Sequence, residues 1–216
     1  MRIIAGCLRG RTLAAPAGHG TRPITDRTKQ ALFDWLAGRF GEHPSLPAID
    51  VLDLFAGAGS LGIEALSRGA AFCGFVEQAP EALRVLRANL ASLSLEADRA
   101  VVVAADALTG QWPESPAGGY GLVFCDPPYR LSAETQPAGP VPRLLARLGG
   151  SAARPAGRTA DSPRGAGRSW CALAAGAIVA LRHDAGVRYD SMSFGRLRWR
   201  QRRDYGGMAI DLFGLD

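Results

Sequence analysis

Apolar runs of strand length alternate with amphipathic stretches of helical length through the middle of the chain. The strand-like runs are residues 48–54, 70–76, 100–105 and 121–125. Helical periodicity falls between them, at residues 60–68, ended by Gly69, and at residues 80–93, begun by Pro80. Nearly continuous apolar strands separated by helices are typical of a parallel sheet covered on both faces. The pattern therefore predicts a doubly wound α/β domain.

The pattern before the first strand is shorter and less regular. Residues 1–21 are basic and glycine-rich, with a strand-like stretch at residues 2–5 and a turn expected at Arg9-Gly10-Arg11. Either Thr25 or Asp26 can cap a helix that runs to about Gly38. We expect residues 1–45 to form a basic hairpin and helix that precede the main domain, residues 46–216.

The pattern after the fourth strand predicts a helix at residues 141–148 and then changes character. Residues 149–169 have no apolar period and are rich in Gly, Pro, Ala and Arg. We interpret them as a flexible basic insertion, with a tolerated loop without function as the alternative. A resumed helix is expected at residues 170–175, a fifth strand at 177–181, and an antiparallel ribbon of 196–203 with 207–213 through Asp204-Tyr205-Gly206. The sequence thus predicts a mostly parallel seven-stranded sheet with an antiparallel C-terminal strand.

Composition narrows the compartment and the cofactors. With 216 residues, of which 47% are hydrophobic, the chain can bury the core of one domain. It has no apolar run of about 18 residues and no signal peptide, so we expect a cytoplasmic protein that does not contact a membrane. The four cysteines form no CxxC pair and the three histidines show no ligand spacing, which predicts neither a disulfide nor a metal site.

Positive charge gathers toward the two ends of the chain. Residues 1–39 carry a net charge of +5, residues 40–153 of −5 and residues 154–203 of +8. Lys29 is the single lysine, so nearly all of the basic residues are arginines, which suit bidentate phosphate contacts and stacking on bases. The uneven distribution points to a polyanionic partner.

The most informative motif is Asp126-Pro127-Pro128-Tyr129, directly after the fourth apolar run. Two consecutive prolines make the turn rigid and leave carbonyl groups beside residues that lack an N–H. A carboxylate, a carbonyl and an aromatic ring together suit a flat base with an exocyclic amine, because the ring stacks while the oxygens accept its N–H bonds. We expect these four residues to hold the group that reacts.

A glycine-rich loop joins the first strand to its helix. It reads Asp53-Leu54-Phe55-Ala56-Gly57-Ala58-Gly59-Ser60-Leu61-Gly62, so its glycines satisfy GxGxxG, which is a weak signal alone. Asp53 at the strand end would repel a pyrophosphate but attract the cationic α-amino group of S-adenosylmethionine. The loop, with Phe55 and the three glycines, therefore favours S-adenosylmethionine over NAD.

Acidic residues follow all of the first four strands. Glu77 after the second strand can accept from both ribose hydroxyls of an adenosine, and Asp106 after the third can accept from the adenine amine. The carboxyl ends of the strands form the rim where open α/β sheets bind ligands. Asp53, Glu77, Asp106 and Asp126 together predict a class I methyltransferase that aligns an amine with the methyl donor and excludes water.

The motifs resemble those of the bacterial 16S ribosomal RNA guanine-N2 methyltransferases. The resemblance covers the chain to about Phe213 except for the insertion, and its restrictive part lies near the amino terminus. The residues that carry it are Met1-Arg2-Ile3-Ile4-Ala5-Gly6, Arg9-Gly10-Arg11, Arg22-Pro23-Ile24-Thr25-Asp26-Arg27, residues 31–36, residues 53–70 and Asp126-Pro127-Pro128-Tyr129.

The resemblance implies transfer of a methyl group to the N2 amine of a guanine in 16S rRNA, within the small ribosomal subunit or an assembly intermediate. We expect the protein to be a monomer. It implies a base pocket at residues 126–129, cofactor contacts at Thr25 and Arg27, and RNA contacts at Arg9, Arg11 and Arg22. Two other functions stay open. A DNA adenine-N6 or cytosine-N4 methyltransferase shares the Asp-Pro-Pro-Tyr motif, and an RNA-binding assembly factor could keep the fold without catalysis.

Overall fold

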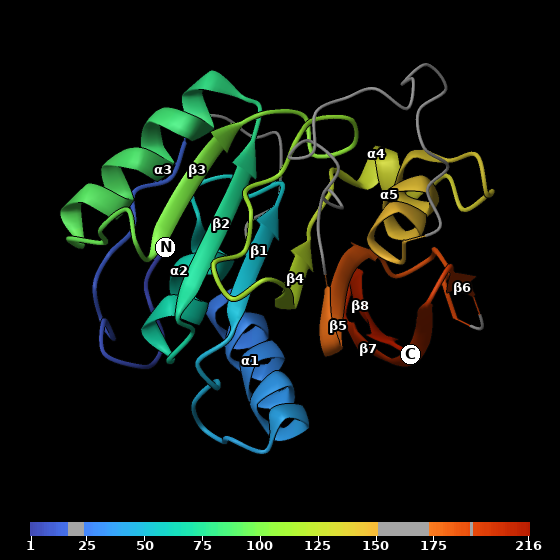
Figure 1. Cartoon of the computed structure of the whole chain (residues 1–216), viewed down its shortest axis with the longest axis horizontal. Coiled ribbons are helices and arrows are strands. Elements are labelled where there is room, and N and C mark those ends of the chain that lie inside the picture. Colours follow the sequence, from blue (N-terminus) through green and yellow to red (C-terminus); the bar gives the residue numbers. More distant parts are fainter. Residues whose placement is uncertain (17–23, 151–172, 191) are drawn as a thin grey trace.

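The computed structural model describes residues 1–16, 24–150, 173–190 and 192–216, which form one mixed sheet with helices on both faces (Figure 1). The strands are β1 Asp50–Leu54, β2 Phe72–Glu77, β3 Ala100–Ala104, β4 Tyr120–Cys125, β5 Leu173–Asp184, β6 Ser193–Phe194, β7 Leu197–Tyr205 and β8 Met208–Leu215. Their order in the sheet is β3-β2-β1-β4-β5-β8-β7-β6.

The first five strands are parallel, and β8, β7 and β6 pair antiparallel beyond β5. The chain lays down β1, β2 and β3 in one direction and then returns to place β4 on the other side of β1. The predicted doubly wound sheet with antiparallel C-terminal pairing is thus confirmed. It has eight strands where seven were expected, because the two-residue strand β6 pairs with β7 at the edge.

Helices cover the two faces in the way that the apolar strands predict. On one face the core joins the sheet to α1 Asp26–Phe40, α2 Ser60–Ser67 and α3 Pro80–Ser92. On the other it joins the sheet to α5 Pro140–Leu148, which follows the short α4 Tyr129–Ser132 (Figure 1). Successive residues point to opposite faces, so Val51 enters the first core and Leu52 the second, and both are fully buried.

The fifth strand corrects two expectations. Leu173 begins β5, so the helix expected at residues 170–175 is wrong for its described part. At its other end β5 continues past Leu181 to Asp184, because Arg182 and His183 are buried by partners from other elements. The ribbon of β7 and β8 is confirmed, but its turn is Gly206-Gly207, since Tyr205 pairs with Met208. Residues 151–169 of the expected insertion lie outside the described residues.

The N-terminal segment is fastened to α2 through a buried carboxylate. Arg2 and Thr12 form the expected antiparallel contact as a single bridge. Glu64 of α2, which is fully buried, accepts hydrogen bonds from the N–H groups of Ile4 at 2.8 Å and Ala5 at 3.0 Å. The side chains of Arg68 and Lys29 complete its environment at 2.8 Å and 3.5 Å. The N-terminal segment therefore packs on the first core as part of the same body.

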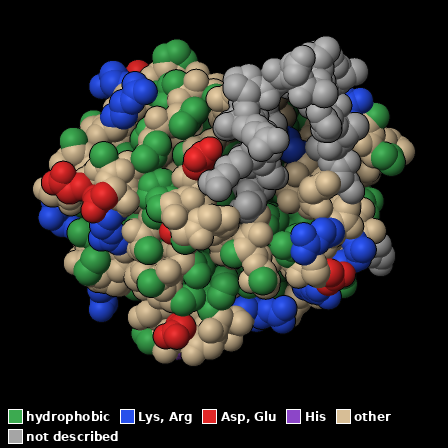
Figure 2. All heavy atoms as spheres, viewed as in Figure 1, with side chains coloured by type: hydrophobic (Ala, Val, Ile, Leu, Met, Phe, Trp, Pro, Cys, Tyr) green, Lys and Arg blue, Asp and Glu red, His purple; other side chains and the backbone are tan. Residues whose placement is uncertain are grey.

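Surface charge on the face shown in Figure 2 occurs in several separate groups, with acidic side chains among the basic ones. Within the described ranges, none of the helices is both long and apolar enough to cross a bilayer. The same residues contain no cluster of three or more His, Cys, Asp or Glu side chains arranged to hold a metal ion.

Candidate active site

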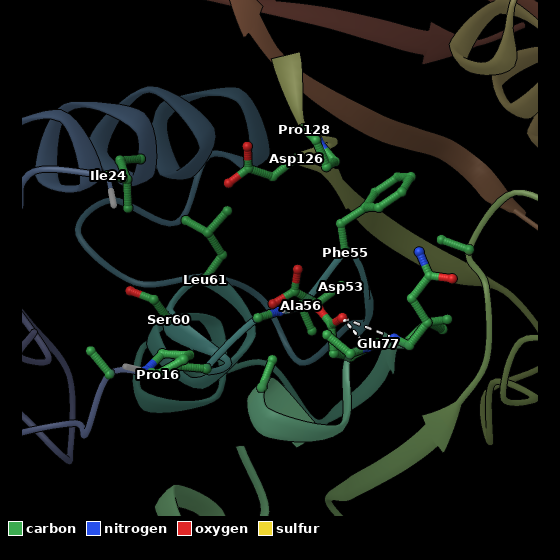
Figure 3. A pocket seen from close by; sticks show the side chains of 18 of the residues that line it. Pro16, Ile24, Asp53, Phe55, Ala56, Ser60, Leu61, Glu77, Asp126 and Pro128 are labelled. Atoms are coloured by element: carbon green, nitrogen blue, oxygen red, sulfur yellow. Dashed lines mark hydrogen bonds between the residues drawn. The ribbon is translucent and has the colours of Figure 1, made fainter. Parts of the chain in front are cut away.

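A pocket of about 430 Å³ lies at the carboxyl ends of β1, β2 and β4, where the chain reverses direction along the sheet. Its volume is within the usual range of roughly 300–1,000 Å³ for small-molecule sites. Carboxylates of Asp53, Glu77 and Asp126, from three different strand ends, face this pocket (Figure 3). Three of the four acidic residues expected on the rim are thus brought together.

The loop after β1 is held in a left-handed conformation that brings its backbone close to the pocket. Phe55, Gly57 and Gly59 have φ angles of 63°, 56° and 83°. A Cβ added at Gly57 would meet nothing within 4 Å, so that position borders open space. A Cβ at Gly62 would lie 2.3 Å from the ring of Phe75, which explains why α2 can pack this closely on β2. The glycines thus serve both approach to a ligand and packing.

Asp53 is a buried acid at the end of β1. It is 2% exposed, and its Oδ2 accepts a hydrogen bond from the Gly62 N–H at 2.9 Å. Burial raises the pKa of Asp53 from 3.8 to about 8, with smaller contributions from the Asp126 and Glu77 carboxylates, although the Gly62 N–H opposes the shift. A cation that entered the pocket beside Asp53 would restore the ionised form. The site is therefore prepared to bind a positively charged group.

Glu77 organises the floor of the pocket through backbone groups. Its Oε2 accepts from the Gly57 N–H at 2.8 Å, and its Oε1 accepts from the N–H groups of Gln78 and Ala79 at 2.9 and 2.8 Å. The same carboxylate thus links the glycine-rich loop to the start of α3 (Figure 3). A ligand with hydroxyl groups could use the remaining acceptor capacity of these two oxygens.

Asp126 lies beside an arginine that the sequence pattern did not reveal. The Arg182 Nε donates to Asp126 Oδ1 at 2.6 Å, and the side chains are 7% and 20% exposed. Burial raises the pKa of Asp126, while the Arg182 guanidinium opposes the rise. Cys125 of β4 pairs with Leu181 of β5, so the parallel register places the next residues, Asp126 and Arg182, side by side. Both of them line the pocket.

The rest of the Asp-Pro-Pro-Tyr motif divides between the pocket and the helix that follows. Pro128 lines the pocket and is the N-cap of α4, whereas Pro127 is buried and Tyr129, half-buried, begins the helix. Tyr189 lies behind this segment, where its hydroxyl donates to the Ser132 carbonyl at 2.7 Å. The segment from Asp126 to Ser132 is thus held at both of its ends.

Several predicted contacts lie outside the lining of the pocket. Asp106 accepts from the Leu108 N–H at 2.9 Å and from the Thr109 hydroxyl at 3.2 Å, while its neighbours Ala105 and Ala107 line the pocket. Thr25 is the N-cap of α1, and Arg27 is exposed in its first turn.

The predicted RNA contacts are likewise remote from the lining. Arg9 is exposed, and Arg11 donates to the Ser92 carbonyl at the end of α3 at 2.8 Å. Arg22 lies outside the described residues.

The pocket wall also includes residues that were not predicted as site residues. Pro16 and Ile24, which flank the undescribed residues 17–23, contribute apolar surface, and Ser60 and Leu61 contribute the start of α2 (Figure 3). Only Arg182 had a usable signal, since a polar side chain directly after an apolar strand of a parallel sheet falls on the same rim as the carboxylates.

The site combines a buried acid, a glycine-rich backbone and an apolar wall with a second acid at the end of the neighbouring strand β4. Gly57 leaves room for close approach, and Asp53 would become ionised beside the cationic amino acid group of a ligand. S-adenosylmethionine has an adenosine and a cationic amino acid end, so the residues present fit that cofactor. Asp126 and Pro128, at the end of β4, line the same pocket.

The chain is similar in sequence to several known proteins. The family described as "Conserved hypothetical protein 95" matches residues 1–139 of the chain. "Ribosomal RNA small subunit methyltransferase D" of Escherichia coli (strain K12) is 41% identical over 130 residues, which are 60% of this chain and 61% of that protein. "Putative rRNA methyltransferase YlbH" of Bacillus subtilis (strain 168) is 39% identical over 139 residues, 60% of this chain and 67% of that protein. The matches thus span about three fifths to two thirds of these relatives.

Solved structures extend the likeness over the whole chain. The structure described as "Putative methyltransferase yhhF from Escherichia coli" superposes with a TM-score of 0.72 and 28% identity, covering 100% of this chain and 98% of the other. The class I methyltransferase fold expected from the sequence is therefore confirmed, together with the predicted family resemblance.

Proposed function

This chain belongs to the family described as "Conserved hypothetical protein 95", and from that premise and the geometry of the pocket we propose that it is an S-adenosylmethionine-dependent methyltransferase of 16S rRNA. The proposed acceptor is the exocyclic N2 amine of a guanine, presented within the small ribosomal subunit or an assembly intermediate. The names of the E. coli and B. subtilis relatives support an rRNA substrate. The observation that carries the proposal is that Asp53 and Asp126, from adjacent strands, face one pocket.

The residues that would hold the cofactor lie mainly at the carboxyl ends of β1 and β2. Asp53 would bind the α-ammonium group, the backbone around Gly57 would approach the amino acid end, and Glu77 would accept from the ribose hydroxyls. Ala105 and Ala107 would border the adenine. When it is bound, S-adenosylmethionine supplies a methyl group that is already activated by its sulfonium.

The residues that follow β4 would bind the base and prepare its amine for attack. The lone pair of an exocyclic amine is delocalised into the ring, so the nitrogen attacks well only when it becomes pyramidal. Asp126 and the Pro127 carbonyl would accept its N–H bonds, which stabilises the positive charge that develops on nitrogen. Pro128 and the apolar wall around Leu61 would exclude water and keep the amine in line. Tyr129 is proposed to stack on the base after a local adjustment, since it does not line the pocket in this structure.

A methyl transfer assay tests the proposal directly. The protein is incubated with methyl-labelled cofactor and with small ribosomal subunits from cells that lack this gene, with naked 16S rRNA or with duplex DNA. We expect label in the subunits or the rRNA, recovered as N2-methylguanosine, and mass mapping then gives its position. Label in adenine or cytosine of DNA would favour the DNA methyltransferase, and tight RNA binding without transfer would favour an assembly factor.

A pair of variants separates the two halves of the site. Asp126→Ala should abolish transfer while S-adenosylhomocysteine still binds, because Asp126 is assigned to the base. Asp98→Ala is the matched control, since Asp98 is an exposed acid on a loop remote from the pocket lining. Equal loss of transfer and of cofactor binding in Asp126→Ala would contradict the assigned role.

A further inference from the structure

Arg182 occupies a position that the steps above leave unused. Its side chain is 7% exposed and lines the pocket, and its Nε donates to Asp126 Oδ1 at 2.6 Å. A carboxylate and a planar guanidinium therefore stand next to each other at the place assigned to the base. Side by side, such a pair presents two acceptor oxygens followed by donor N–H groups.

The hydrogen-bonding edges of the nucleobases differ in a way that this order can detect. Along its Watson–Crick edge guanine has the N2 amine and the N1–H as donors, followed by O6 as an acceptor. Adenine and cytosine have an amine donor directly followed by a ring nitrogen that accepts. Proteins commonly read unstacked bases on this edge. Acceptor, acceptor and donor is the order that complements guanine, and it is the order that cytosine itself presents.

We propose that Asp126 and Arg182 together select guanine, with the Asp126 carboxylate accepting from the N2 amine and N1–H while the Arg182 guanidinium donates to O6. The inference rests on the proposed function of the pocket. It makes Arg182 a specificity-determining residue. Adenine or cytosine in the same orientation would place a ring nitrogen lone pair against the Asp126 carboxylate.

The reason for strong discrimination is burial. Both side chains are largely removed from water, so a base that does not match their acceptor and donor groups forfeits hydrogen bonds that solvent cannot replace. Sites that are built to bond a polar group can reject an analogue without it by roughly 10⁴-fold, and one good bidentate contact gives on the order of 10–100-fold. The contact from Arg182 alone is expected to contribute the smaller of these two factors to the preference for guanine, because Asp126 still accepts from N1–H without it.

Base analogues at the methylated position test this inference. The accepting guanine is first mapped, and small subunits are then reconstituted with 16S rRNA carrying 2-aminopurine there, introduced by splinted ligation. 2-Aminopurine keeps the N2 amine but lacks both N1–H and O6. The wild-type protein should prefer guanine in kcat/KM by roughly 100-fold or more. Arg182→Met should lower that ratio at least about tenfold, mainly by slowing guanine.

Controls separate recognition from a structural effect. Arg188→Met changes an exposed arginine and should leave the ratio as in the wild type. S-adenosylhomocysteine binding shows that the pocket of Arg182→Met is intact, and if that variant does not fold, Arg182→Lys carries the same test because it keeps charge but loses the planar fork. An Arg182 variant that folds and methylates guanine and 2-aminopurine more slowly by the same factor would overturn the inference. So would an Arg182 variant that recovers full activity at higher pH with an unchanged preference for guanine, since Arg182 would then only keep Asp126 ionised. Absence of N2-methylguanosine with the wild-type protein would instead refute the proposed function.

Discussion

Cofactor binding should release a proton from Asp53. In the free protein burial raises the pKa of this acid to about 8, so at pH 7 roughly nine in ten molecules carry the proton. An ammonium group beside Asp53 favours the ionised form and lowers its pKa. Binding of a ligand with an α-ammonium group at pH 7 is therefore expected to release about 0.9 proton for each ligand bound. At pH 9 Asp53 is already largely ionised, and its own contribution to the release should fall to about 0.1.

Isothermal titration calorimetry measures this number. The binding enthalpy of S-adenosylhomocysteine is determined at pH 7 in buffers with different ionisation enthalpies, and the slope gives the protons released. S-adenosylhomocysteine is preferred because it keeps the α-ammonium group but lacks the sulfonium, which would also act on Asp126. 5′-Methylthioadenosine, which lacks the amino acid part, should bind with almost no proton release. Asp53→Asn should remove the release and weaken S-adenosylhomocysteine binding on the order of 10–100-fold.

Three results would refute the reasoning. One is a slope near zero with S-adenosylhomocysteine at pH 7, which would mean that Asp53 is ionised before the ligand arrives. Another is an equal proton release from the Asp53→Asn variant, which would assign the proton to another group. Equal release with 5′-methylthioadenosine would place the titrating acid near the adenosine instead of the amino acid end.

The same acid should make stability depend on pH. Between pH 4 and pH 8 the folded state holds a proton on Asp53 that the unfolded chain has lost, so the contribution of this group to the free energy of unfolding falls as pH rises. At about 1.4 kcal/mol for each pH unit, the contribution of Asp53 to the free energy of unfolding changes by several kcal/mol at most over this range. Thermal melts at pH 8 should therefore show Asp53→Asn to be more stable than the wild type. A lower melting temperature for the variant at pH 8 would contradict the shift.

Two pairs of variants test the packing around the pocket. Gly62→Ala should lower the free energy of unfolding by about 1–3 kcal/mol, because its Cβ would press on a buried ring. Gly57→Ala should cost less stability and mainly weaken S-adenosylhomocysteine binding. Denaturant melts measure the stability of both variants and calorimetry measures their ligand binding, and equal effects of the two substitutions would contradict these expectations. Tyr189→Phe should cost about 1 kcal/mol by leaving the Ser132 carbonyl without its donor, while Tyr205→Phe should be neutral or slightly stabilising, since among described groups its buried hydroxyl has no hydrogen-bond partner. Denaturant melts in which Tyr205→Phe loses as much stability as Tyr189→Phe would oppose this reading.

The strand ends explain why much of the site was predictable. Apolar runs located β1 to β4 to within a residue or two, and the carboxyl ends of parallel strands must share one rim. Asp53, Glu77 and Asp126 therefore met in one pocket without any knowledge of distances. Asp106 has the same position in the pattern, but its side chain turns back to cap its own loop at Leu108, a local competition that spacing cannot reveal.

The end of β5 shows what hydropathy misses. Arg182 and His183 looked like the polar end of a strand, yet both are buried because partners cover them: His183 Nε2 lies 2.8 Å from Asp211 Oδ2, and neither residue is exposed. The partner of His183 is 28 residues away on β8. Pairing over such a separation leaves no trace in local periodicity, so the strand was predicted to end before Arg182 and His183.

The number of basic residues near the amino terminus overstates the charge that is available to a partner. Seven basic residues among the first 39 suggested a surface for a polyanion, but several of them serve the fold. Lys29 is buried against Glu64, Arg2 pairs with Asp26, and Arg11 binds the end of α3. Charges used in this way attract phosphate less, because a carboxylate or carbonyl already neutralises or occupies them. Among the described arginines of this segment, Arg9, Arg27 and Arg39 are exposed and make no such contact, so contacts with RNA should depend more on these three than on the total charge.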